Sequence, residues 1–183
     1  LPDQPAHGMK GANVATNVYH ALGSYKRFPS LVSYSSNNIT KNAKGAGSFR
    51  DNANNIFNFV ATRTDIFQLA SGAFTSRKSG LTGGEADYVT FTQFGNYVIA
   101  SNGVDQPQYY LMGTSTNFAN LNAIQSAGTT PLFRVSGVVR DFLVSGNIST
   151  ATNRIHWSGI NDISAWSGKQ SDFQDLPGSG GKI

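Results

Sequence analysis

Residues 138–177 read VVRDFLVSGNISTATNRIHWSGINDISAWSGKQSDFQDLP, and this stretch decides the predicted fold. It contains an apolar run typical of a β-strand, a polar turn, a second strand with alternating side chains, and a loop that carries a tryptophan. Both tryptophans of the protein, Trp157 and Trp166, fall inside it. The stretch therefore predicts a strand–turn–strand unit and serves as the reference for the rest of the chain.

Two earlier segments follow the same plan of an apolar strand, a polar turn and a second strand. They read IFNFVATRTDIFQLASG from residue 56 and YVIASNGVDQPQYYLMG from residue 97, beside FLVSGNISTATNRIHWSG from residue 142. Comparable second strands begin next to Asp65, Pro107 and Asn153, which lie 42 and 46 residues apart. Four-stranded propeller blades repeat with a period of about 40–50 residues. The repeat predicts a partial β-propeller, and a β-sandwich with recurring strands remains the alternative.

The predicted fold class is therefore all-β, with repeated antiparallel strand units. Residues 1–44 are predicted to form an extended N-terminal arm and loop, and residues 45–183 the β-sheet repeat domain with about three blade-like units. Pro2, Pro5, Gly8 and Gly11 predict little regular structure at the start. At the other end, a strand is expected to begin at Ile183, with further chain after it. Asp141, inside an apolar run, is expected to be a buried acid, an ion-pair partner or a turn cap.

The composition favours a structural role over catalysis. Charged residues make up 13% of the chain, about half the usual share, so Asn, Ser, Thr and Gly must supply the polar surface. A neutral polar surface suits contacts between subunits, because the centres of large interfaces avoid charge. The net charge of +4 comes from scattered basic residues, which predicts at most non-specific, passing contact with DNA. No run is long and apolar enough for a membrane helix.

No catalytic, cofactor-binding or metal-binding constellation stands out. There is no cysteine, and the three histidines, His7, His20 and His156, lack the i, i+4 spacing of a zinc site. His156 is predicted to lie on the solvent face or at an interface. Trp166, Tyr109 and Tyr110 could stack on sugar rings, so a carbohydrate- or receptor-binding module is an alternative function.

Four segments carry a resemblance to a known family. They are FTQFGNYVIASNGVDQPQYY from residue 91, VVRDFLVSGN from residue 138, NRIHWSGINDISAWS from residue 153 and DFQDLPGSGGKI from residue 172. Together they resemble the tail nozzle, or tubular tail, proteins of short-tailed bacteriophages, a group that includes packaged-DNA-stabilisation proteins. The opening ALGSYKRFPSL is similar to an early stretch of that family, with departures at Ser24, Lys26 and Arg27.

The resemblance implies a non-enzymatic β-propeller platform in the virion. It implies a homo-oligomeric ring, expected to be a hexamer, that extends the portal and adaptor proteins and lets DNA pass. The residues that carry it most specifically are predicted to form turns and packing contacts, with no chemistry of their own: Asn161, Asp162, Trp166, Asp172, Phe173, Asp175 and Pro177.

Overall fold

The computed structural model describes residues 16–22, 24–30 and 32–178, and divides the chain into two compact units, Leu1–Tyr34 and Ser35–Ile183. The predictions for the proline- and glycine-rich start and for a strand at Ile183 lie outside the described residues. In the first unit, β1 (Val18–Ala21) pairs antiparallel with β2 (Ser24–Arg27).

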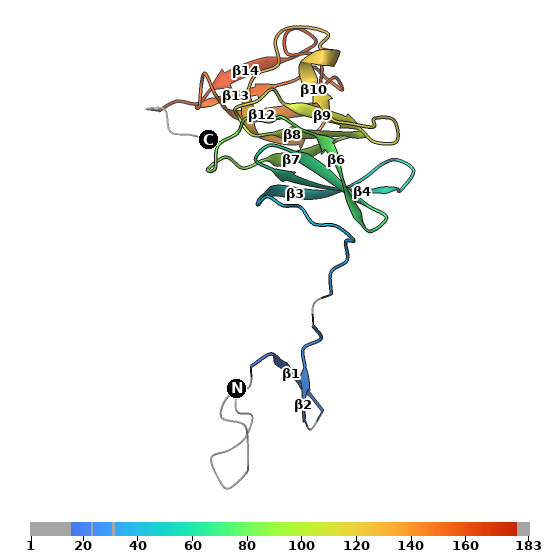
Figure 1. Cartoon of the computed structure of the whole chain (residues 1–183). Coiled ribbons are helices and arrows are strands. Elements are labelled where there is room, and N and C mark those ends of the chain that lie inside the picture. The colour runs from blue at the N-terminus through green and yellow to red at the C-terminus, as the bar shows by residue number, and fades with distance from the viewer. Residues whose placement is uncertain (1–15, 23, 31, 179–183) are drawn as a thin grey trace. The chain divides into compact units, whose positions relative to one another are not determined.

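The second unit consists of three four-stranded antiparallel sheets in which spatial order follows chain order (Figure 1). The first sheet comprises β3 (Ala43–Arg50), β4 (Ile56–Thr62), β5 (Ile66–Ala70) and β6 (Ala73–Lys78). The second comprises β7 (Thr90–Phe94), β8 (Tyr97–Ser101), β9 (Gln108–Leu111) and β10 (Ala119–Asn120). The third comprises β11 (Phe133–Val139), β12 (Phe142–Ile148), β13 (Arg154–Trp157) and β14 (Asp172–Asp175). One short 3₁₀ helix, Leu121–Ile124, follows β10.

The hydrophobic core lies in two layers, one on each side of the second sheet. Successive side chains of a strand point to opposite faces. On β8, Val98 belongs to the layer shared with the first sheet, whereas Ile99 belongs to the layer shared with the third. Phe59 of the first sheet and Phe133 of the third are almost fully buried in these two layers. The middle sheet is therefore covered on both faces.

The first strands of the three sheets hold neighbouring sheets together. Strand β7 lies beside both β3 and β11. The Thr90 hydroxyl donates to the Arg134 carbonyl at 2.6 Å, and the Thr92 hydroxyl donates to the Ser136 carbonyl at 2.9 Å. On the other side, the Val89 amide donates to the Lys44 carbonyl at 3.1 Å. The two threonine bonds join side chain to backbone, and the Val89 bond joins backbone to backbone, so the neighbouring sheets approach closely at their first strands.

Gly45 makes one of these approaches possible. A Cβ atom built on Gly45 would lie 1.9 Å from the Val89 carbonyl oxygen. No non-bonded contact can be that short, so any side chain here would push the first two sheets apart.

The all-β prediction is confirmed, and so are the repeat units. The strands β5, β9 and β13 begin directly after Asp65, Pro107 and Asn153. Neighbouring sheets pack face to face as in a sandwich, while the recurring four-stranded meander is the unit of a propeller blade. Within the described residues the sheets do not close into a ring, and no helix there is long and apolar enough to cross a bilayer.

Candidate functional site

The loop of residues 158–171 joins β13 to β14 and holds three of the predicted motif residues. Its backbone folds back on itself, with the Gly159 amide donating to the Ala165 carbonyl at 2.7 Å. Asn161 lies at the turn with a φ of 50°, a left-handed conformation that asparagine tolerates. The Asn161 amide donates to the carbonyl of Asp141 in the β11–β12 turn at 2.7 Å. The loop is thus fixed against the third sheet.

Trp166 anchors this loop in the core. Its side chain is 3% exposed and packs against Phe133, with 5.8 Å between ring centroids. The indole N–H donates to the Ile163 carbonyl at 3.0 Å, and the Trp166 amide donates to the Ala127 carbonyl at 2.7 Å. Trp166 is a packing residue, as predicted for the motif. It is closed to solvent, so its proposed use as a sugar-stacking platform is wrong.

Tyr110 fails as a platform for the same reason, because it is 4% exposed and belongs to the core between the first two sheets. Tyr109 is half-buried and packs against the other core layer beside Tyr97, with 6.2 Å between the ring centroids. Alternation along β9 places these two tyrosines on opposite faces of the sheet, so they cannot share one binding surface.

Asp162 is the centre of a polar cluster in the same loop. Its carboxylate accepts bonds from Lys169 Nζ at 2.7 Å, from the Ser164 amide at 2.9 Å and from the Ser126 hydroxyl at 3.2 Å. Burial by itself raises the pKa of a carboxyl group. Here the donors, led by Lys169 and Ser164, outweigh burial and lower the pKa of Asp162 to about 2. Asp162 therefore stays ionised and stabilises the loop.

The predicted motif residues of β14 form a second cluster at the outer edge of the third sheet. Arg154 of β13 pairs across the strands with Asp175 through two bonds, 2.6 Å from Nε and 2.8 Å from Nη2. The same guanidinium lies 3.8 Å from the centroid of the Phe173 ring. Asp172 is exposed and accepts the Phe173 amide, and Pro177 is exposed after the strand. This cluster fixes the register of β14.

The sequence did not predict the partners of these motifs. Among these partners, only Arg154 has a local sequence signal, because it begins the strand that precedes the DFQD segment. Lys169 lies seven residues after Asp162 in an irregular loop, and Ser126 is 36 residues before it. No spacing rule connects side chains over such a distance, so only the fold reveals the cluster.

A hollow of about 250 Å³ opens beside the Asp162 cluster. Phe94 and Tyr97 of the second sheet line it on one side, and Asn161, Asp162 and Ser164 on the other. Aromatic and hydrogen-bonding groups facing each other are the elements of a small-ligand site, although the volume is just below the usual range of about 300–1,000 Å³.

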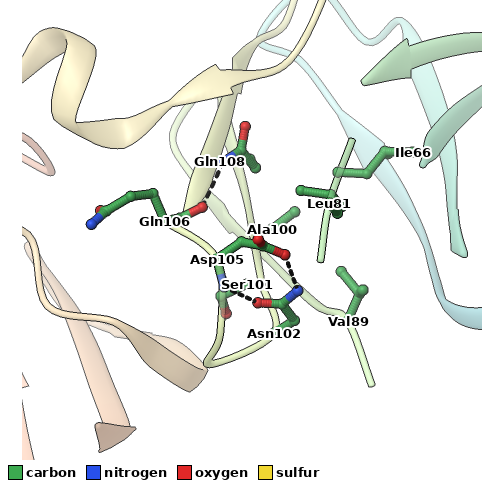
Figure 2. A pocket seen from close by; sticks show the side chains of 9 residues that line it. All are labelled: Ile66, Leu81, Val89, Ala100, Ser101, Asn102, Asp105, Gln106 and Gln108. Atoms are coloured by element: carbon green, nitrogen blue, oxygen red, sulfur yellow. Dashed lines mark hydrogen bonds between the residues drawn. The ribbon is translucent and has the colours of Figure 1, made fainter. Parts of the chain in front are cut away.

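A smaller cavity of about 10 Å³ lies between the first and second sheets (Figure 2). Ile66, Leu81 and Val89 supply its apolar wall, while the Asn102 amide donates to Asp105 at 2.7 Å on the polar side. The Gln108 side-chain oxygen is buried there without a hydrogen-bond partner among the described residues. The space suits one water molecule, which would satisfy that oxygen.

The titratable groups of the described residues include no carboxylic acid with a raised pKa. Each described carboxylate with a shifted pKa is shifted downward by hydrogen bonds or nearby cations: Asp51, Asp65, Glu85, Asp105, Asp162 and Asp175. A general acid at neutral pH needs the opposite shift. No group of three potential metal ligands occurs among the described residues.

The structure bears on two sequence predictions for single residues. Asp141 is exposed in the two-residue turn between β11 and β12, which excludes the buried acid among its alternatives and agrees with a place in a turn. His156 is not on the solvent face, because it packs edge-on against Trp166 at 5.2 Å and against Phe173 at 5.9 Å. Burial lowers the pKa of His156, so it is neutral at neutral pH.

Comparison with known proteins adds no assignment. No protein-family model matches the chain, and no curated protein matches it significantly.

Proposed function

We propose that the protein is a structural component of a bacteriophage tail, part of a nozzle or tubular-tail ring that extends the portal and adaptor and forms the DNA passage. It acts without catalysis, as a homo-oligomer of six in the virion, in contact with other tail proteins. The proposal combines the family resemblance with the roles that the motif residues have in the fold.

The observation that carries the proposal is that three of the distinctive motif residues are engaged in packing or structural pairing. Asp162 is bound by Lys169, Trp166 is buried, and Asp175 is clamped by Arg154. A catalytic motif would leave such groups directed at a substrate. Three sheets bonded to one another through their first strands form a stiff plate, which suits a mechanical part.

The charge distribution fits a passage that DNA crosses without sticking. Among the basic residues of the second unit, Lys44 is paired with Glu85, Arg134 with Asp87 and Lys169 with Asp162. Each cation that is free to neutralise a phosphate adds salt-dependent affinity for DNA. Ion pairing and the low charge density therefore keep the salt-dependent affinity for DNA small. A lumen lined by unpaired lysines and arginines in an assembled ring would contradict this part of the proposal.

The test is incorporation into particles. Particles from a host that encodes the chain are purified, the chain is located by mass spectrometry, and its ring is located by electron microscopy with a tagged chain. A deletion complemented by the wild-type gene should restore complete tails, and Asp175→Asn should restore them too, because it weakens only an edge contact. A chain that is expressed but absent from particles, with tails intact without it, would refute the proposal.

A second candidate function, a carbohydrate- or receptor-binding β module of a tail, is favoured by the hollow between Phe94, Tyr97 and Asp162. Glycan-array binding that Asn161→Gly abolishes, by removing an exposed side chain of the hollow, and that Tyr88→Ala at an exposed position elsewhere preserves, would support it. Trp166→Ala is unsuitable for this test, because it removes a core side chain.

A further inference from the structure

The third sheet has an apolar face that no other described part of the second unit covers. Phe142 and Val144 alternate with Leu143 on β12, and Leu143 is fully buried toward the second sheet. Phe142 and Val144 therefore point to the opposite face, together with their cross-strand partners Val139 and Trp157. Val139 is 59% exposed, and the other three are half-buried. We call these four residues the open face of the third sheet.

The open face occupies the same sheet positions that the second sheet uses to bind the third. In the second sheet, Tyr97 and Ile99 alternate on β8, and their cross-strand partners are Phe94 and Tyr109. These four residues pack into the core layer shared with the third sheet. In both sheets a two-residue turn joins the first strand to the second, so positions can be counted from that turn. The corresponding positions are Phe94 and Val139, Tyr97 and Phe142, Ile99 and Val144, and Tyr109 and Trp157.

The first sheet has the complementary open face. Phe59 points into the core, so its neighbour Val60 points outward, together with Phe67 across the strands. Leu69 and Phe74 pair in the next row of the same face. All four are half-buried, not buried. Residues 35–42 are attached at the rim of this sheet through the Asn37–Phe74 and Lys41–Asp65 contacts.

The two open faces are the two halves of the contact that already joins consecutive sheets. In each contact within the chain, the face that one sheet directs toward the next sheet along the chain packs against the face that the next sheet directs back toward it. The outer face of the third sheet and the outer face of the first sheet belong to neither core layer of the second unit. Their rims also differ in charge: Asp172 ends the row that contains Val144 and Trp157, whereas Arg50 pairs with Ile56 on the face of the first sheet.

We propose that the open face of the third sheet binds the open face of the first sheet in a second copy of this chain. The contact is head-to-tail, because it joins different surfaces of the two copies. Two chains joined twice in this way bring six sheets together, within the range of about four to eight blades in closed propellers. The inference rests on the packing of the sheets and not on the tail function, so either can fail without the other.

The experiment measures the mass of the purified 183-residue chain in solution by light scattering over a wide range of concentration. The wild type is expected at about twice its monomer mass of 19.5 kDa. Val144→Asp on the third sheet and Leu69→Asp on the first should each give monomers. Val104→Asp, which replaces a 43% exposed loop residue away from both faces, should associate like the wild type.

Mixing the two monomeric variants decides the geometry of the contact. The Val144→Asp chain keeps an intact first sheet, and the Leu69→Asp chain keeps an intact third sheet. The mixture therefore keeps one of the two contacts and should form a one-to-one dimer, at a higher concentration than the wild type needs. Circular dichroism and thermal unfolding confirm that each variant is folded. A monomeric wild type, association that survives both substitutions, or folded monomeric variants that do not combine when mixed would each overturn the proposal.

Discussion

Replacing Trp166 by Phe tests whether this residue is an anchor of the third sheet. The substitution keeps one aromatic ring but removes the indole N–H that bonds the buried Ile163 carbonyl. Leaving a buried acceptor unpaired costs about 1–3 kcal/mol. The lost ring empties roughly 40 Å³, which at ~24 cal/mol per Å³ costs about 1 kcal/mol more. The expected loss of unfolding free energy is therefore on the order of 2–4 kcal/mol.

Trp157→Phe is the matched control, and both variants are compared in the Leu69→Asp chain, where the open face of the third sheet stays free. The Trp157 indole also donates to a backbone carbonyl, that of Gln170 at 2.9 Å, but at an exposed site where water can replace it. Trp157→Phe should therefore lower the free energy of unfolding by less than about 1 kcal/mol. Since the chain has two tryptophans, each variant leaves one, and urea unfolding can be followed by its fluorescence alone.

The remaining tryptophan adds a second readout for the pair. In Trp157→Phe the emission comes from buried Trp166 and should be blue-shifted relative to that of Trp166→Phe. In thermal unfolding, the Trp166→Phe midpoint should fall by roughly 4–16 °C. Equal losses of stability in both variants, or a solvent-exposed emission from Trp166, would refute the assignment of Trp166 to the core.

Three further predictions follow from other contacts. The pKa of Asp162 is lowered to about 2 from an unfolded value of about 3.9, so its ionised form stabilises the fold above about pH 4, and this stabilisation disappears as the pH falls through 2. Asp162→Asn should remove a pH-dependent contribution on the order of 1–2 kcal/mol to the free energy of unfolding. A variant that loses stability in acid as steeply as the wild type would contradict this. Gly45→Ala should lower the free energy of unfolding by about 1–3 kcal/mol or more, because it forces the first two sheets apart. Gly137→Ala, with open space at its Cβ position, should lower it much less, and equal thermal midpoints of the two variants would disprove the close approach. Arg154→Gln removes the charge that pairs with Asp175, so the wild-type advantage should be small and should shrink in high salt. A difference that salt leaves unchanged would argue against a contribution from this exposed ion pair.

The sequence by itself predicted the strands and their repetition, because both depend on local chemistry. Short apolar runs marked β4, β8 and β12, and the starts of the second strands were located to within one residue by Asp65, Pro107 and Asn153. Turn-forming residues such as Gly95 and Asn96 break the apolar pattern wherever a hairpin turns. Period-two patterning and turn preferences act over a few residues, so they can be read without knowledge of the fold.

Only the tertiary structure decided which face of each strand is covered. A period of two shows that Val98 and Ile99 point to opposite sides, but both are buried because the second sheet lies between two others. The same rule could not separate Asp141 in a turn from an acid inside a strand. Contacts between sheets join residues about 44 positions apart, as in Thr92 and Ser136, and their partners depend on packing over that distance. The open faces of the first and third sheets likewise emerge only once it is known which faces the chain itself has covered.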